Sequence, residues 1–416
     1  MKNCALLILL AAFILTGCGG GGSDDTTVSD PGTTVAAEPE ITIVTENNPR
    51  NVLSVYVNWT TEEPMDSEVQ FGEGGYEYKI HDDTQRTDHR VLVIGMHEET
   101  TYLIKAVSSN GSSSLTDETT WRTGQLPFGV PEGVMLTNNT ARSQEGWTLM
   151  NVQVGDGNTF ALSDYPPRVV MYDHEGLPVW YYIDGTTRDM SGAVSTELLD
   201  SNTILIGPTG EEPPREVDLA GNVIWEGPVN VPEEEKLSHH VSKLSNGDYL
   251  LLRWMKDSDG GPTDARLEEV TSDNQVVWDW NLYDFYTPPE GESGDWCHAN
   301  SATVDPVNNE VYLSCRWLGL FKTTYTNPEL QWHMAALYNA AGTGDITFIP
   351  PESRFMDIHD PEIHDDGTII FFDNDGWDFA QGPGEYHSRI LEFAVNEETK
   401  EAELVWEFPG SFDVDP

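Results

Sequence analysis

The chain has 416 residues, is 38% hydrophobic and 10% aromatic, and carries 71 acidic against 21 basic side chains, a formal charge of −50. This apolar and aromatic content supports sizeable cores, so the acidity belongs to the surface of a folded protein and excludes a disordered chain. The charge excludes nucleic acid as a partner, because its phosphate backbone would be repelled. Four cysteines are too few for a disulfide scaffold in a chain of this length.

Residues 1–17 predict an export signal, because Lys2 is followed by the apolar run 5–15 and small residues. That run is too short to span a bilayer. It ends in Leu15-Thr16-Gly17-Cys18, which resembles the lipobox of bacterial lipoproteins. The resemblance implies a lipid on Cys18 and, because no Asp follows directly, anchoring to the outer membrane on its periplasmic or cell-surface side. An ordinary signal peptide with an incidental cysteine is the alternative.

Residues 18–40 are rich in Gly, Ser, Thr, Asp and Pro, which predicts a flexible tether. From 41 to 124 apolar residues alternate with polar ones, as at Val55, Val57 and Trp59, and no helical period occurs. This pattern predicts a small β-sandwich that resembles a fibronectin type III or immunoglobulin-like module. We assign no chemistry to it.

Residues 125–416 contain a repeated unit of strand, polar turn and strand that ends in an aliphatic residue followed by Trp. Copies end at Trp180, Trp225 and Trp278, with weaker ones at Trp332 and Trp406. The period suits blades of four short strands, which predicts an all-β protein whose second domain is a β-propeller. Chance tryptophans in a sandwich are the alternative.

A second repeat carries the chemistry. His239 and His359 each precede a turn glycine by eight residues, and His298 precedes the turn residue Asp305 by seven. Inner strands of a propeller line its axis, so we expect the three imidazoles to converge there. The alternative is that each histidine satisfies a turn or a buried carbonyl in its own blade. His240 is the alternative to His239.

Three imidazoles suit either a zinc or copper ion or an anionic group. Arg316 ends the strand that returns from His298, and a cation there argues against a metal. The pattern therefore favours a sulfate- or phosphate-like group and no cofactor. Cys297 and Cys315 precede these two residues on strands that should be adjacent, so they are either a disulfide or two buried thiols.

The motifs resemble those of the bacterial arylsulfate sulfotransferase family, which does not use PAPS. They are Asp295-Trp296-Cys297-His298-Ala299-Asn300-Ser301, then Ser314-Cys315-Arg316, and Ile358-His359-Asp360 through Phe372-Asp373-Asn374. The resemblance implies a six-bladed propeller after the sandwich, with further strands after Trp406 that either the N-terminal strands or a longer chain would supply. Its implied site residues are the nucleophile His359, the sulfuryl-binding and proton-transferring His239, His298 and Arg316, and the substrate-binding Asn300 and His240.

The expected reaction is ping-pong transfer of a sulfuryl group from an aryl sulfate donor to a phenol acceptor, through a sulfohistidine. A homodimer is a possible assembly. Trp296, Trp317 and Trp377 either stack on the aryl rings or pack within blades. The alternative functions are a non-catalytic cell-surface propeller that binds sulfated or phenolic ligands or proteins, and a histidine-ligated metal enzyme.

Overall fold

The computed structural model is all-β, as predicted, with only two short 3₁₀ helices, η1 (Leu282–Asp284) and η2 (Pro351–Ser353), in its described part. The predicted signal, the lipidation site Cys18 and the tether lie outside the described residues. No helix in the described ranges is long and apolar enough to cross a membrane. The structure describes residues 41–127, 129–135, 146–152, 168–183, 195–208, 213–228, 235–255, 264–286, 296–337, 344–364, 366–374 and 388–409.

The N-terminal strands form one antiparallel sheet in the order β1-β2-β4-β5, with β3 paired to β2. Its strands are β1 (Val44–Asn47), β2 (Val55–Gly72), β3 (Tyr78–Val93), β4 (Thr101–Ser109) and β5 (Ser114–Arg122). Val55 and Val69, from opposite halves of the long strand β2, belong to the same buried core. The two halves of β2 therefore bury their apolar residues in one shared core. This arrangement is compatible with the predicted sandwich.

The remaining described strands form five further sheets, each built from consecutive stretches of the chain. Pairing within these sheets is antiparallel, except that β21 lies parallel to β25. The sheets comprise β6 (Thr148–Val152), β7 (Arg168–Tyr172) and β8 (Pro178–Ile183); β9 (Thr196–Leu198), β10 (Thr203–Ile206), β11 (Arg215–Asp218) and β12 (Val223–Glu226); β13 (Glu235–Lys243), β14 (Tyr249–Met255), β15 (Asp264–Val270) and β16 (Val276–Asn281); β17 (Ala299–Asp305), β18 (Glu310–Cys315), β19 (Gly319–Thr324) and β20 (Leu330–Ala335); and β21 (Thr347–Ile349), β22 (Ile358–Ile363), β23 (Thr368–Asp373), β24 (Arg389–Asn396) and β25 (Glu401–Pro409).

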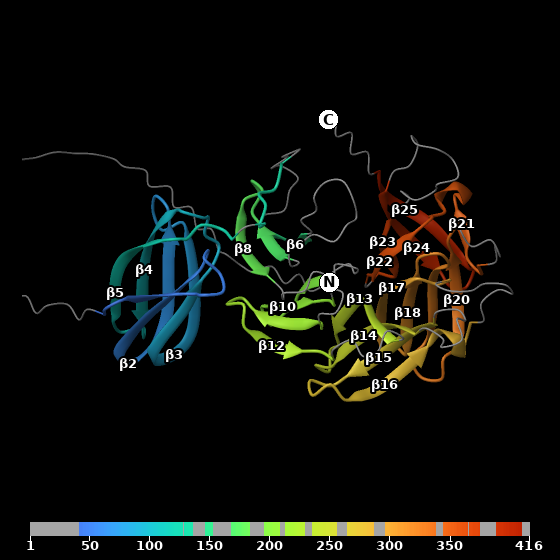
Figure 1. The fold of residues 1–416 in the computed structure, drawn as a ribbon, viewed down its shortest axis with the longest axis horizontal. Helices are drawn as coiled ribbons and strands as arrows, with labels where there is room; N and C mark the ends of the chain where they lie inside the picture. Colours follow the sequence, from blue (N-terminus) through green and yellow to red (C-terminus); the bar gives the residue numbers. More distant parts are fainter. Residues whose placement is uncertain are drawn as a thin grey trace, which may run out of the picture.

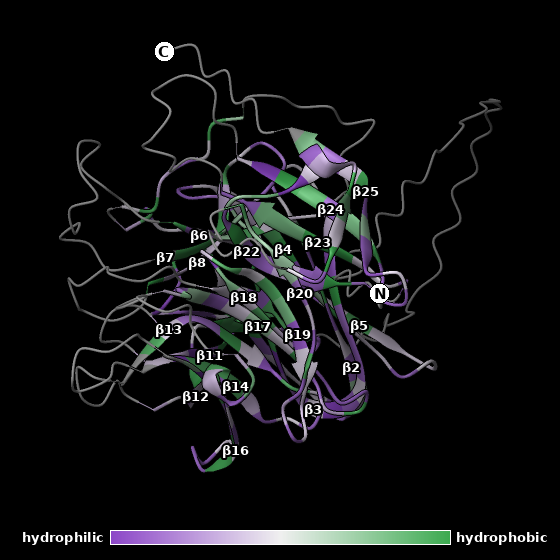
Figure 2. Ribbon diagram, turned by 90° about the vertical axis from the view of Figure 1, so that its right-hand side faces the viewer, coloured by the Kyte–Doolittle hydropathy of each residue, from purple (hydrophilic) through white to green (hydrophobic). Residues whose placement is uncertain are grey.

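The tryptophan repeat marks the last strand of each sheet. The five residues Trp180, Trp225, Trp278, Trp332 and Trp406 lie in β8, β12, β16, β20 and β25. Consecutive sheets pack face to face, because each of four buried apolar clusters draws residues from two neighbouring sheets. Figure 1 shows the sheets following one another along an arc, and Figure 2 shows hydrophobic stretches along their strands. This arrangement is compatible with the predicted propeller, whereas the count of six blades stays a prediction.

The N-terminal sheet docks on the first two of these sheets (Figure 1). The buried amide of Asn51 donates to the carbonyl of Tyr181 in β8 at 2.9 Å, and the amide of Asn48 donates to the carbonyl of Ala220 at 3.0 Å. Leu53, fully buried, packs in a cluster with Tyr181. Two neighbouring sheets therefore both contact the N-terminal sheet and the residues that follow β1.

Candidate active site

One edge strand of each of three consecutive sheets positions one predicted histidine. His239 lies within β13, His298 directly precedes β17, and His359 lies within β22. The strands β13 and β17 contact each other, and so do β17 and β22. Three side chains that are far apart in the sequence are thereby placed on neighbouring inner strands, as expected from a propeller.

Each of these strands carries an irregularity close to its histidine. The ladder register shifts between Leu237 and Val241 in β13, between Ala299 and Ser301 in β17, and between His359 and Glu362 in β22. Left-handed backbone accompanies the irregularities, with φ of 25° at His239, 50° at His298 and 49° at Asp360. Such φ values are uncommon outside glycine and cluster at functional sites. The bulges turn these side chains out of the regular alternation of the strands.

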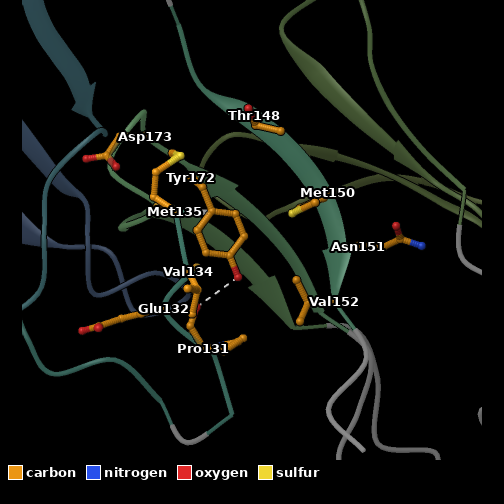
Figure 3. Close-up of a pocket in the computed structure, with 12 residues that line it drawn as sticks. Pro131, Glu132, Val134, Met135, Thr148, Met150, Asn151, Val152, Tyr172 and Asp173 are labelled. Atoms are coloured by element: carbon orange, nitrogen blue, oxygen red, sulfur yellow. Dashed lines mark hydrogen bonds between the residues drawn. The ribbon is translucent and has the colours of Figure 1, made fainter. Parts of the chain in front are cut away.

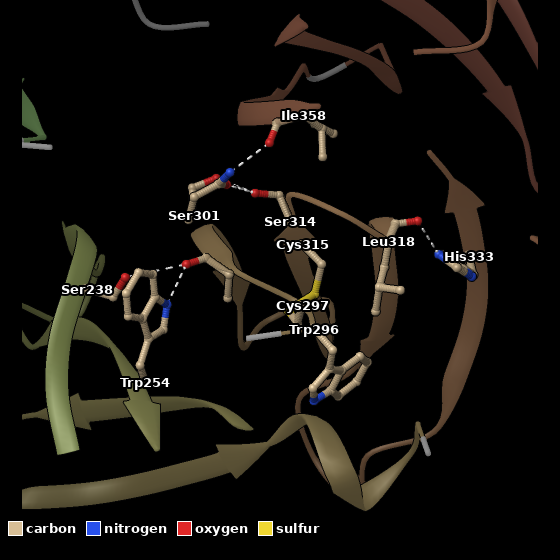
Figure 4. The surroundings of a disulfide bond; sticks show 12 residues. Ser238, Trp254, Trp296, Cys297, Ser301, Ser314, Cys315, Leu318, His333 and Ile358 are labelled. Atoms are coloured by element: carbon tan, nitrogen blue, oxygen red, sulfur yellow. Dashed lines mark hydrogen bonds between the residues drawn. A yellow bond between two sulfur atoms is a disulfide. The ribbon is translucent and has the colours of Figure 1, made fainter. Parts of the chain in front are cut away.

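His239 and His298 form an aromatic group with Trp254 of β14. The ring centroids of the two histidines are 5.6 Å apart, and Trp254 lies 5.2 Å from His239 and 4.7 Å from His298. The hydroxyl of Ser238 is 2.6 Å from Nδ1 of His239, which fixes the orientation of that imidazole. The indole N–H of Trp254 donates to the carbonyl of Ala299 at 2.9 Å, so the wall formed by this ring is also held (Figure 4).

Arg316 directly follows β18 and lies beside the histidines. A disulfide joins Cys297 to Cys315 with a Cα separation of 4.8 Å, so it connects the residues that precede His298 and Arg316 (Figure 4). The backbone N–H of Arg316 donates to the carbonyl of His298 at 3.2 Å. The guanidinium carbon lies 4.5 Å from the ring centroid of Trp317, within range of a cation–π contact.

Asp357 is a site residue that the sequence interpretation missed. Its side chain is 1% exposed, and its Oδ2 accepts a hydrogen bond from Nε of Arg316 at 2.7 Å. Its Oδ1 lies 3.4 Å from Nδ1 of His359. Asp357 precedes His359 by two residues at the start of a strand, where such a pair shares a face, and that spacing is the signal that could have found it.

Burial and neighbouring charges shift the protonation of this pair. Burial lowers the pKa of His359; the hydrogen bond with the backbone of Asp357 opposes this, and the neighbouring Arg316 and His298 add to the lowering. Burial raises the pKa of the Asp357 carboxyl to about 6, although the hydrogen bond from Arg316 opposes the rise. At neutral pH the site therefore holds a neutral His359 imidazole beside an ionised carboxylate and a guanidinium.

The two residues expected to bind substrate are placed differently. Asn300 is buried, its Nδ2 donates to the carbonyl of Ile358 at 2.7 Å, and its Oδ1 accepts from Ser314. It thus joins the inner strands β17 and β22 behind the site. Burial lowers the pKa of His240, with the carboxylate of Asp360 opposing, and its Nε2 has no hydrogen-bond partner among the described residues.

A family model described as arylsulfotransferase (ASST) matches residues 130–411. The chain belongs to the arylsulfotransferase family. It is therefore a transferase of the sulfotransferase kind. No curated protein matches the chain.

Several solved structures align with this arylsulfotransferase. A protein of unknown function from Bacteroides caccae is 11% identical, with 83% of this chain and 94% of that chain covered and a TM-score of 0.37. The computationally designed Ika8 protein is 8% identical over 59% of this chain and 57% of its own, with a TM-score of 0.28. A eukaryotic initiation factor is 10% identical over 92% and 90%, also with a TM-score of 0.28. These scores are too low to support an inference about this chain.

The tryptophans near the motifs of the arylsulfotransferase divide into two groups. Trp296 is buried and packs against Tyr283 and Tyr286, so it belongs to the blade core. Trp317 is half-buried, and its ring centroid lies 6.1 Å from that of His298. Trp254 was missed by the sequence interpretation, and Trp377 lies outside the described residues.

An open pocket of about 470 Å³ lies elsewhere in the arylsulfotransferase, over β6 and β7 (Figure 3). Its lining includes Glu132, Val134, Met150, Tyr172 and Asp173, and none of the predicted site residues. We therefore place the candidate active site at His298, Arg316 and His359 and not at this pocket. Across the described ranges, no group of three metal-ligating side chains is placed to hold an ion.

Proposed function

We propose that this arylsulfotransferase moves a sulfuryl group from an aryl sulfate to a phenol through a covalent intermediate on His359. The observation that carries the proposal is that Asp357 lies against both Arg316 and His359, with His298 close enough to act electrostatically on Asp357 and on His359. A nucleophile needs its lone pair, and the lowered pKa keeps the His359 imidazole neutral.

In the first half-reaction, the lone pair of an imidazole nitrogen of His359 attacks sulfur. The nitrogen–sulfur bond forms, the bond from sulfur to the aryl oxygen breaks, and the phenolate leaves with the electron pair. Arg316 and the N–H groups of His239 and His298 offset the negative charge on the sulfuryl oxygens. One flanking histidine gives its proton to the leaving oxygen, a role worth roughly 10²- to 10⁴-fold in rate.

The second half-reaction runs the same steps in reverse with a new phenol. The flanking histidine removes the phenol proton, the phenol oxygen attacks sulfur, and the nitrogen–sulfur bond breaks to restore neutral His359. Donor and acceptor never need to be bound together, which makes the kinetics ping-pong. We assign the aryl rings to the space beside Trp254 and Trp317, because both indoles flank His298 and aromatic pairs favour stacked or edge contacts.

Replacement of the nucleophile tests this proposal. We expect His359→Ala to lose at least about 10³-fold in phenol release from a chromogenic aryl sulfate, because removing a covalent nucleophile ends its pathway. His364→Ala is the matched control, since His364 lies in the hairpin after β22 and contacts Thr368 and Glu392. It should keep wild-type rates.

Mass spectrometry of the wild-type protein, quenched with donor but without acceptor, should find one sulfuryl group on the peptide that contains His359. Full activity in His359→Ala, or the label on another residue, would contradict the assignment. Saturable binding of aryl sulfates with no turnover would instead support the non-catalytic alternative.

A further inference from the structure

Asp357 is held by its backbone as well as by its side chain. Its N–H donates to Oδ1 of Asp373 at 3.1 Å, and its carbonyl accepts from the N–H of Asn374 at 2.8 Å. Asp373 is itself fully buried and accepts a hydrogen bond from Arg389 at 3.0 Å. The carboxylate of Asp357 therefore starts from a fixed point at the end of the β22–β23 hairpin.

The two oxygens of this carboxylate have different surroundings. Oδ2 accepts the 2.7 Å hydrogen bond from Nε of Arg316. Oδ1 is buried, makes no hydrogen bond within the described part of the chain, and lies 3.4 Å from Nδ1 of His359. A buried carboxylate oxygen without a hydrogen bond is costly, and the arrangement becomes favourable when a positive charge forms beside it.

The proposed reaction creates that charge. When Nε2 of His359 bonds to sulfur, the ring gains a sulfuryl substituent while Nδ1 keeps its proton, so the imidazole becomes cationic. Nδ1 also lies 3.3 Å from the carbonyl of Asp357, and both contacts of Nδ1 favour the tautomer with its proton there. That tautomer leaves the lone pair on Nε2, the nitrogen that must attack.

We infer that Asp357 is the positioning residue of this site: its carboxylate holds Arg316 by one oxygen and, by the other, sets the tautomer of His359 and stabilises the imidazolium of the sulfohistidine. The inference rests on the proposed function and deepens it. No bond to Asp357 forms or breaks, and its proton count does not change during turnover. One carboxylate thus links the group that binds the sulfuryl oxygens to the group that attacks sulfur.

The test is Asp357→Asn, which keeps an oxygen for Arg316 but removes the charge beside His359. We expect kcat for phenol release to fall by about 10²- to 10⁴-fold, as when a histidine loses its orienting carboxylate, while KM for the donor changes only a few-fold. Glu268→Gln is the matched control, because Glu268 is a buried carboxylate of β15 that pairs with Arg253 at 2.6 Å and belongs to another sheet than Arg316 and His359. It should leave kcat unchanged.

The pH profile separates positioning from a purely structural role. The groups whose charges act on Asp357 are Arg316, Asp373 and His298, and its pKa of about 6 predicts that the wild-type rate falls as the pH drops through that value. The asparagine variant cannot titrate there, so its acidic limb should move to lower pH, where His359 alone protonates. An unchanged acidic limb, or a kcat within about threefold of wild type, would overturn the inference.

If the asparagine variant does not fold, Asp357→Glu keeps the charge and displaces it by one methylene. A tenfold or larger fall in kcat is then expected, and wild-type kcat would overturn the inference. Sulfuryl labelling of the wild-type protein distinguishes the two levels of the argument. If His359 is labelled and the Asp357 variants have normal rates, only the positioning role of Asp357 is contradicted. If no label is found, the proposed function is contradicted as well.

Discussion

At the scale of single residues, burial sets the protonation of the site, because it disfavours the charged forms of Asp357 and His359. Burial raises the pKa of Asp357, although the hydrogen bond from Arg316 lowers it. Burial also lowers the pKa of His359, although the hydrogen bond with the backbone of Asp357 raises it. Neither shift favours the folded protein at neutral pH. At pH 7 Asp357 is still an ionised carboxylate and His359 is a neutral imidazole with a free lone pair. These are the forms that the proposed chemistry uses.

The raised pKa of Asp357 makes a prediction about stability. The pKa of its carboxyl is about 6 in the folded protein and 3.8 in the unfolded chain. As the pH falls, the folded protein therefore binds this proton at a higher pH than the unfolded chain does. The contribution of this carboxyl to folding is therefore fully present below the unfolded pKa and is lost as the pH rises through the folded one. We expect the free energy of unfolding of the wild type, relative to Asp357→Asn, to increase when the pH falls from about 7 to about 5.

Urea unfolding of both proteins at the two pH values measures this difference, and His359, present in both, cancels to first order. A difference that stays constant, or that grows in the opposite direction, would show that Asp357 is not buried as an unfavourable charge. Equal slopes of the unfolding transitions are the control that both proteins unfold from comparable states.

Residue types and spacing located part of this site from the sequence. The three histidines recur with the blade period, and Arg316 follows a strand in a chain with only 21 basic residues, so both stood out. Asp357 did not, because it is one of 71 acidic residues and only its spacing of two residues from His359 sets it apart in the sequence. The pairing of Asn300 with Ile358 was also beyond reach, since it depends on how two blades meet.

At the scale of elements, the β17–β18 hairpin carries two site residues at its open end. The bulge between Ala299 and Ser301 interrupts the ladder close to that end, and the disulfide between Cys297 and Cys315 closes it. The carbonyl of Cys297 also accepts from the N–H of Trp317 at 3.4 Å. The covalent link thus compensates locally for a ladder that the bulge weakens.

We therefore expect the double variant Cys297→Ser, Cys315→Ser to lose activity beyond its loss of stability. The bridge spans 18 residues, which corresponds to about 3 kcal/mol of stabilisation in the chain-entropy model. Well below the melting temperature, where the variant is still folded, kcat should fall at least about tenfold because His298 and Arg316 lose their alignment. Rates and melting curves of the two proteins, measured side by side, check this.

A variant that melts earlier yet turns over at the wild-type rate when folded would limit the disulfide to stability.

The tryptophan repeat shows how far the sequence could predict the elements, because it marked the last strand of each of the five sheets described after residue 125. It did not predict the bulges of β13, β17 and β22, because left-handed backbone at histidine and aspartate follows from tertiary packing and has no signature in local propensity.

At the scale of the whole molecule, a formal charge of −50 opposes the approach of an anionic aryl sulfate. Charges at the surface act through solvent and are screened beyond about 10 Å at 0.1 M salt, whereas Arg316 acts on a bound sulfuryl group at contact. The two effects therefore respond differently to ionic strength. In the proposed reaction, the surface charge therefore repels the anionic donor at long range, and Arg316 attracts its sulfuryl group at contact.

We expect kcat/KM for the donor to rise several-fold between about 0.02 M and 0.3 M sodium chloride, because the repulsive surface field is screened. The phenol acceptor is neutral and supplies an internal control, since its KM should stay constant over the same range. Initial-rate measurements with each substrate varied in turn decide the matter. A steep fall of donor kcat/KM with salt would contradict this account.

The attachment of the N-terminal sheet has a consequence for where the catalytic unit begins. Residues 130–411 match the family model, yet Leu53 completes a core with Tyr181, and Asn48 and Asn51 satisfy carbonyls of two adjacent blades. A segment cut at the family limit would present that apolar surface to water and leave the carbonyls of Tyr181 and Ala220 without these amide donors. The contacts that stabilise the first two sheets therefore extend beyond the residues that the family model matches.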